Sequence, residues 1–249
     1  MEDDRQMALL RDLFEGLDRL APGSLEATKR ALGLIDGLPK RPAIADLGCG
    51  AGVASLVLAE ATDGTVAAVD IHPPFLRRLA TNAAARGLRG RIHPVAADIT
   101  KPPFPDHAFD LIWSEGALYS IGFETGLRVV RRLVRPDGWI AVSELTWLTD
   151  TPPAAAERFM ANEYPGMTTV QRNLELVQAA GFAPAGHFVL PSTAWTDDYY
   201  GPVRERLATF RAEHANDAEA VADAMQAEAD LYDRFGDSYG YVFIVARAA

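Results

Sequence analysis

A glycine-rich turn preceded by an acidic residue is the first feature of this sequence with a chemical use. Residues 46–52 read DLGCGAG, so glycines stand at positions 48, 50 and 52 after Asp46. Glycine lets the backbone turn tightly and lets a ligand approach without a Cβ in the way. A dinucleotide-binding turn instead reads G-x-G-x-x-G and holds a pyrophosphate at the following helix. The alternating glycines and the acid therefore favour a ligand that carries an ammonium group over one that carries a phosphate.

Two more acids end the next two β-rich runs, TVAAVD (65–70) and RIHPVAAD (91–98). A carboxylate at Asp70 suits the two hydroxyls of a ribose, and one at Asp98 suits an adenine amino group. The carboxyl ends of parallel strands share one edge of a sheet, where open α/β sheets bind ligands. This pattern indicates a nucleoside. The alternatives are an ordinary strand-to-helix turn for the glycines, a helix N-cap for Asp70 and a surface turn for Asp98.

The elements that must position these residues alternate between short β-rich runs and helical segments, which predicts parallel strands with helical crossovers. The periodicity predicts helices around 52–61, 74–86 and 123–135. Five strands are expected, at residues 43–47, 65–70, 91–98, 109–115 and 139–145.

The flanking segments are predicted to be mainly helical. One stripe of a helix over the first twenty residues carries the apolar side chains of Met7, Leu10, Phe14, Leu17 and Leu20, and Ser24 is a fair N-cap for a second helix. After residue 145 two further strands are expected, at 186–190 and 239–247. We therefore expect an N-terminal helical cap (1–40), a ligand-binding core (41–145), and a segment (146–249) that supplies cap or lid insertions and the final strand pair.

Composition limits the partners. The 249 residues suit one well-buried α/β domain with appendages. A net charge of −10 argues against nucleic acid as the main partner. Four arginines on one predicted helix face fit a solvated surface, with an anion or partner contact as the alternative; they are Arg128, Arg131, Arg132 and Arg135.

The sequence lacks the features of a membrane span, a signal peptide and a metal site, and these absences guide the expected location and metal content. No apolar run approaches the roughly 18 residues of a membrane span, and the acidic start lacks the basic region of a signal peptide. We expect a cytoplasmic protein with no membrane partner. The single cysteine, Cys49, and the spacing of the five histidines imply no metal site.

The sequence resembles the class I S-adenosylmethionine-dependent methyltransferases. The matching motifs are DLGCGAG (46–52), VAAVDIHPPFL (66–76), AADIT (96–100), FDLIWSEGALYSIGF (109–123) and LVRPDGWIAVSEL (133–145). The resemblance is closest to the small-molecule branch that includes the ubiquinone and menaquinone C-methyltransferases. It implies an α/β, Rossmann-like fold: a seven-stranded, mostly parallel sheet with an antiparallel last strand, plus a helical cap.

The resemblance also implies the cofactor, S-adenosylmethionine, with S-adenosylhomocysteine as product. Asp46 and the glycines would hold the methionine part, Asp70 the ribose, and Asp98 with Ile99 the adenine. The residues expected to bind the cofactor are Asp46, Gly48, Cys49, Gly50, Gly52, Asp70, Ile71, His72, Asp98, Ile99, Ser114 and Glu115.

Candidate catalytic residues lie at the ends of the fourth and fifth predicted strands. Glu115 and Glu144 are both expected to face the cleft beside the cofactor, with Tyr119 just beyond. Glu115 is the first candidate for a general base, and binding the cofactor ammonium is its alternative role; Glu144 can instead anchor a helix or loop. Aromatic residues at or beyond strand ends are expected to wall a substrate pocket, with ordinary packing as the alternative: Tyr119, Trp147, Tyr164, Trp195, Tyr199 and Tyr200.

The expected function is methyl transfer from S-adenosylmethionine to a small-molecule acceptor by in-line displacement. The alternatives are a sensor that binds the cofactor or its product without catalysis and, less favoured by the charge, an RNA methyltransferase. We expect a monomer or homodimer. The sequence does not indicate whether carbon, nitrogen or oxygen accepts the methyl group.

Overall fold

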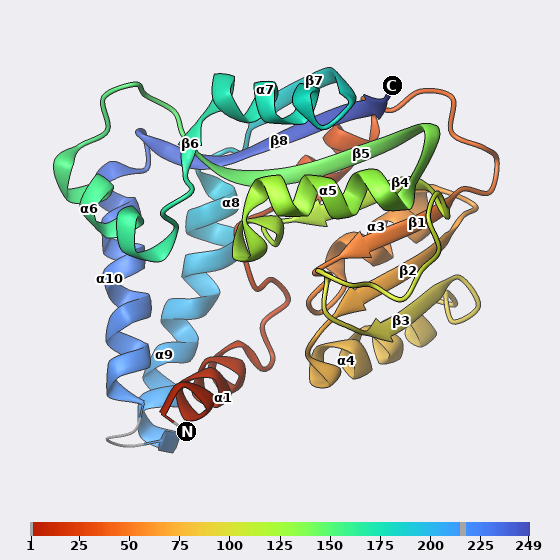
Figure 1. The fold of residues 1–249 in the computed structure, drawn as a ribbon. Helices are drawn as coiled ribbons and strands as arrows, with labels where there is room; N and C mark the ends of the chain where they lie inside the picture. The colour runs from red at the N-terminus through yellow and green to blue at the C-terminus, as the bar shows by residue number, and fades with distance from the viewer. Residues whose placement is uncertain (1, 215–217) are drawn as a thin grey trace.

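One mixed sheet forms the centre of the molecule (Figure 1) in the computed structural model, which describes residues 2–214 and 218–249. Its strands run in the order β3-β2-β1-β4-β5-β8-β7, and the two-residue β6 (Thr168–Thr169) pairs with β5 off this path. The strands are β1 (Ala43–Leu47), β2 (Thr65–Asp70), β3 (Ile92–Ala96), β4 (Phe109–Glu115), β5 (Val134–Trp147), β7 (Phe182–Val189) and β8 (Tyr239–Ala248).

Strand direction confirms the expected fold class. β1 to β5 pair in parallel along the path, whereas β8 is antiparallel to both β5 and β7. The sheet is therefore mostly parallel, and its last strand in sequence is antiparallel. Parallel strands buried on both faces read as apolar runs, which explains AIADL and FDLIWSE in β1 and β4.

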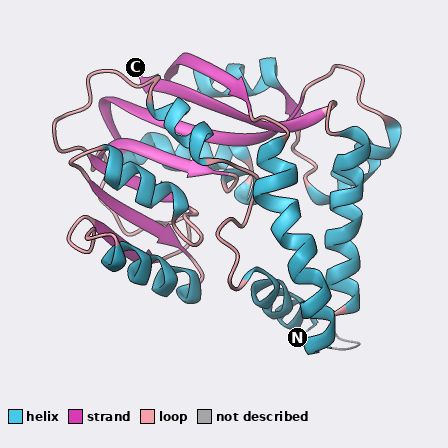
Figure 2. Cartoon of the chain, turned by 180° about the vertical axis from the view of Figure 1, so that it is seen from behind, coloured by secondary structure: helices cyan, strands magenta, loops and turns pink. Residues whose placement is uncertain are grey.

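Helices cover both faces of the sheet (Figure 2). Successive side chains of a strand point to opposite faces, so Trp113 and Ile112 of β4 belong to different apolar clusters. The Trp113 face packs against α2 (Leu25–Leu32), α3 (Val53–Ala61) and α4 (Pro73–Ala85). The Ile112 face packs against α5 (Phe123–Leu133) and α7 (Val170–Ala179).

A helical layer lies at one end of the sheet, where α9 and α10 run side by side and α1 lies against them (Figure 1). Its helices are α1 (Glu2–Phe14), α6 (Ala154–Glu163), α9 (Gly201–His214) and α10 (Glu219–Phe235), with α8 (Thr193–Trp195) and a π-helical turn (Thr196–Tyr200) leading into α9. No helix within residues 2–214 and 218–249 has both the length and the hydropathy that a bilayer span requires.

The N-terminal helix is shorter than predicted. It ends at Phe14, because Gly16 adopts a left-handed φ of 93°, and the backbone carbonyl of Leu17 instead accepts a hydrogen bond from Arg78 Nη1. Leu20 therefore leaves the predicted stripe and reaches the glycine turn, where a Cβ on Gly50 would come within 2.7 Å of Leu20 Cδ1. The N-terminal segment thus covers the ligand-binding edge of the sheet.

Candidate functional site

The glycine turn joins β1 to α3 in a conformation that needs glycine. Gly48 and Gly52 have φ values of 73° and 84°, in the left-handed region that residues with a side chain rarely adopt. A Cβ on Gly52 would overlap the buried Leu79, and one on Gly48 would overlap Ala117. Both amides of Gly48 and Cys49 donate to the carbonyl of Val69, 2.8 and 2.9 Å away, so the turn is fixed to β2.

A cavity of about 470 Å³ opens beside this turn. All of the predicted cofactor residues line this cavity except Gly52 and Ser114. Gly52 shapes the turn against Leu79, and Ser114 Oγ donates to the carbonyl of Leu47 inside the sheet. The predicted residues that line the cavity are Asp46, Gly48, Cys49, Gly50, Asp70, Ile71, His72, Asp98, Ile99 and Glu115.

Asp70 ends β2, as predicted, and each oxygen of its carboxylate already accepts one hydrogen bond. One oxygen accepts from the amide of Gly50 at 2.9 Å and the other from the amide of His72 at 2.8 Å. An ionised carboxylate has about four acceptor positions, so each oxygen keeps free lone pairs. Asp70 can therefore fix the turn and still accept two hydroxyls.

Asp98 lies two residues beyond the end of β3 and does not end the strand as predicted. It is exposed at the rim of the cavity, next to Ile99. The amide of Thr100 donates to Asp98 Oδ1 at 2.7 Å, and this hydrogen bond lowers the pKa of the carboxyl group. The sequence analysis did not select Thr100, which lines the same rim.

Asp46 is buried at the base of the cavity. Burial, together with the nearby charges of Glu115 and Asp70, raises the pKa of Asp46 to about 7, even though a 2.6 Å hydrogen bond from Ser55 Oγ opposes the rise. A buried carboxylate with so few compensating donors is stabilised by a cationic ligand. This environment fits the ammonium group of the methionine moiety.

Binding of S-adenosylhomocysteine is expected to weaken by about fivefold as the pH falls from about 7 to about 6. The reason is that protonation of Asp46, with a pKa of about 7, removes the charge that pairs with the ligand ammonium. Affinity falls again at alkaline pH, where the α-amino group of the ligand loses its proton. Calorimetry from about pH 6 into the alkaline range measures both losses of affinity. The Asp46→Asn variant should not show the loss at acidic pH. If that loss persists in Asp46→Asn, a group other than Asp46 causes it.

Glu115 ends β4 and lines the cavity, as expected, but donors already surround its carboxylate. Thr28 Oγ1 and Trp113 Nε1 donate to Oε1 at 2.6 and 2.9 Å, and Arg19 Nη1 donates to Oε2 at 3.1 Å. The ion pair is largely buried, with 12% of each side chain exposed. This arrangement attaches the N-terminal segment to the sheet. Arg19 and Thr28 were not predicted from the sequence, because nothing local links them to Glu115, which is 96 and 87 positions away.

Glu144 does not face the cavity, contrary to expectation. β5 extends to Trp147, so Glu144 is an internal residue, and the residue that pairs with Glu115 is Ser143. Neighbouring residues of a strand point to opposite faces, so Glu144 lies on the other face of the sheet. Burial raises the pKa of Glu144 to about 8 even though Tyr164 Oη donates to it at 2.6 Å, and Oε2 has no partner.

A second, smaller chamber of about 130 Å³ adjoins the first. The two share Leu20, Ala21, Pro22 and Tyr119 as lining residues. Of the aromatic residues predicted for a substrate pocket, Tyr119, Tyr164, Trp195, Tyr199 and Tyr200 line this chamber. Trp147 does not line it; its ring packs edge-on against Tyr239 with centroids 6.0 Å apart.

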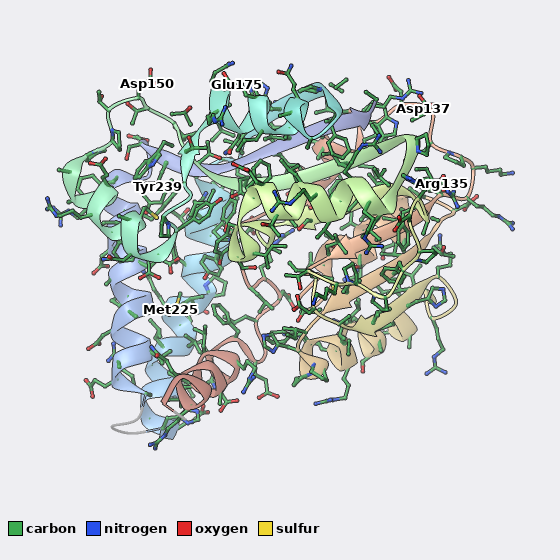
Figure 3. The ribbon with its side chains drawn as sticks, viewed as in Figure 1. Arg135, Asp137, Asp150, Glu175, Met225 and Tyr239 are labelled. Carbon is green, nitrogen blue, oxygen red and sulfur yellow. The ribbon has the colours of Figure 1, made fainter. Side chains whose placement is uncertain are left out.

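Three further residues of this chamber were not predicted from the sequence: Glu228, Tyr239 and Tyr241. The period of two in YGYVF was a usable signal, because it places both tyrosines on one face of β8. Tyr239 lies where the sheet meets the helical layer (Figure 3). No local signal marks Glu228, one of several acids on α10.

The arginines of α5 do not form an open basic patch. Arg132 and Arg135 form ion pairs with Asp106 and Asp110, and Arg131 donates to the terminal residue Ala249. Arg128 donates to Thr125. These contacts suit a solvated face.

Comparison with known proteins agrees with this geometry. Residues 44–138 match the methyltransferase domain family. The sterol 24-C-methyltransferase ERG6B of Gibberella zeae is 28% identical over 167 residues, which cover 64% of this chain and 43% of that protein. The chain thus spans less than half the length of this curated relative.

Two solved structures share the whole fold. A methyltransferase from Geobacter sulfurreducens, in complex with S-adenosylhomocysteine, has a TM-score of 0.84 and 16% identity, covering 97% of this chain and 98% of its own. The [4+2]-cyclase SpnF has a TM-score of 0.75 and 21% identity, covering 98% and 93%. Residues 44–138 are therefore similar to a methyltransferase domain, and the chain has the α/β, Rossmann-like fold of these methyltransferase structures.

Proposed function

We propose that this chain transfers a methyl group from S-adenosylmethionine to a small acceptor held in the second chamber. The observation that carries the proposal is the shared wall between the two spaces. Leu20, Ala21, Pro22 and Tyr119 line both the cavity beside the glycine turn and the aromatic chamber. The two spaces therefore adjoin at these residues, and a methyl donor in one would face an acceptor in the other at this junction.

The cavity suits the cofactor in shape and charge. When bound, S-adenosylmethionine supplies a methyl group already activated by the positive charge on sulfur. Gly48 and Gly50 line the cavity, Asp46 holds the ammonium, and Asp70 accepts the ribose hydroxyls. Asp98 and Ile99 are assigned to the adenine. The protein's main tasks are then to align the acceptor and to exclude water.

A general base is needed only if the acceptor must lose a proton, and it then contributes about 10²- to 10⁴-fold. The proposed groups are Glu115, Tyr119 and Glu144. Of these, Tyr119 lines both spaces, but burial raises its pKa to about 12, which keeps the phenol neutral. Glu144 reaches the chamber only through Tyr164, so we assign it a positioning role. The proposed acceptor class follows the resemblance to small-molecule methyltransferases.

Incubation with methyl-labelled S-adenosylmethionine and a fractionated metabolite extract tests the function. We expect label in a small molecule and none in RNA, because the chain carries a net charge of −10. The matched control is Asp70→Ala, which should transfer little label at a subsaturating cofactor concentration. Shared fold does not establish chemistry, as the cyclase SpnF illustrates. Tight cofactor binding without any label transfer would contradict methyl transfer and support a sensor.

A further inference from the structure

The second chamber is walled mainly by aromatic rings. Trp195 stacks on Tyr241, with centroids 5.3 Å apart, and Tyr199 lies 4.9 Å from Tyr200. Tyr119 meets the edge of Tyr164 at 5.6 Å. These rings come from four separate parts of the chain and converge on one space of about 130 Å³, which is smaller than the roughly 300 Å³ of a drug-sized site. The chamber therefore suits a head group rather than a large, flat molecule.

The charged residues of this chamber are acidic. Glu163 and Glu228 line it, and none of the described residues that line it is Lys, Arg or His. A phosphate or carboxylate bound here would meet negative charge without a compensating cation. A cation would instead meet the carboxylates within an aromatic lining.

Glu228 is the better placed of the two acids. It projects from α10 into the wall of the chamber, where Tyr200 Oη donates to its Oε1 at 2.8 Å. Among the described residues, Tyr200 alone donates a hydrogen bond to this carboxylate, so the other oxygen remains for a ligand. Burial raises the pKa of Glu228, which a bound cation would reverse.

We propose that this chamber binds the ammonium group of an amine-bearing acceptor, held against Glu228 and the surrounding rings. This inference rests on the proposed function, because it assigns the chemical class of the acceptor. Rings and a carboxylate around one small space recognise alkylammonium groups in proteins. The ammonium serves as the recognition group, and the atom that receives the methyl group is left open.

Choline and its neutral isostere 3,3-dimethylbutan-1-ol test the proposal, because they share one shape and differ in charge. Titration into protein saturated with S-adenosylhomocysteine should show choline binding about tenfold tighter. Glu228→Gln keeps the acceptor for Tyr200 and removes the charge, so it should weaken choline by about fivefold and leave the isostere unchanged. Asp230→Asn is the matched control, since it removes an exposed acid from the same helix and should change neither affinity.

The cofactor titration that precedes each measurement separates the two proposals. Equal affinities for choline and the isostere, or no binding of either, in protein that binds S-adenosylhomocysteine would overturn the amine assignment and leave the proposed function intact. Failure of the unaltered protein to bind S-adenosylhomocysteine would overturn the proposed function itself. The comparison of the two probes uses the unaltered chain, so it stands even if Glu228→Gln does not fold.

Discussion

Asp70→Ala is expected to weaken binding of S-adenosylhomocysteine by about tenfold or more. A hydrogen bond to a charged group contributes about 1.5–3 kcal/mol, and the loss of one such bond corresponds to about tenfold or more in affinity. Asp70 is buried, and its two oxygens also hold the amides of Gly50 and His72. Truncation therefore removes the ribose acceptor and loosens the turn that carries it.

Calorimetry on folded protein measures this effect, with folding checked by thermal unfolding. The matched control is Asp63→Ala, which removes an exposed carboxylate beside the same strand and away from the cavity, and should leave the dissociation constant unchanged. A second variant, Asp70→Asn, retains an acceptor for one amide. Its dissociation constant should lie between those of Asp63→Ala and Asp70→Ala. An unaltered dissociation constant in folded Asp70→Ala would refute the ribose assignment.

The cavity beside the glycine turn was predictable because its residues are local to strand ends. Asp46, the glycines and Asp70 lie on consecutive β-α units, and parallel strands bring their carboxyl ends to one edge. The left-handed turns at Gly48 and Gly52 likewise follow from their residue type. For these residues, the sequence pattern alone determines their position at the edge of the sheet.

The second chamber depends on contacts that the sequence pattern does not contain. Glu144 lies on the face opposite to the expected one, because its orientation depends on where β5 ends and on the register that pairs Glu115 with Ser143. Glu228 enters the chamber through the packing of α10, which has an acid at many positions. Such placement follows from tertiary packing, and periodicity identifies only the face of an element.

Glu115→Gln is expected to destabilise the protein by about 2 kcal/mol, because the variant loses a largely buried charged hydrogen bond with Arg19. The amide oxygen of the glutamine can still accept a hydrogen bond from Trp113 or Thr28. The lost stability therefore comes mainly from the ion pair with Arg19. Arg19→Ala should destabilise by a similar amount, and the double variant should show a coupling of about 1 kcal/mol or more. Urea unfolding measures all three. Glu175→Gln is the control, since its pair with Arg172 is exposed and contributes under about 1 kcal/mol.

The same variant decides what Glu115 does in turnover. Arg19 precedes the shared wall at Leu20, so loss of the ion pair should loosen that wall and weaken cofactor affinity together with stability. Arg19→Ala, which leaves the carboxylate in place, should then reproduce the loss of affinity. A general base behaves differently: Glu115→Gln would lower turnover by about a hundredfold while affinity and stability stay near their original values. Because three donors already hold the carboxylate, we expect the first pattern, and the second would show that Glu115 abstracts a proton.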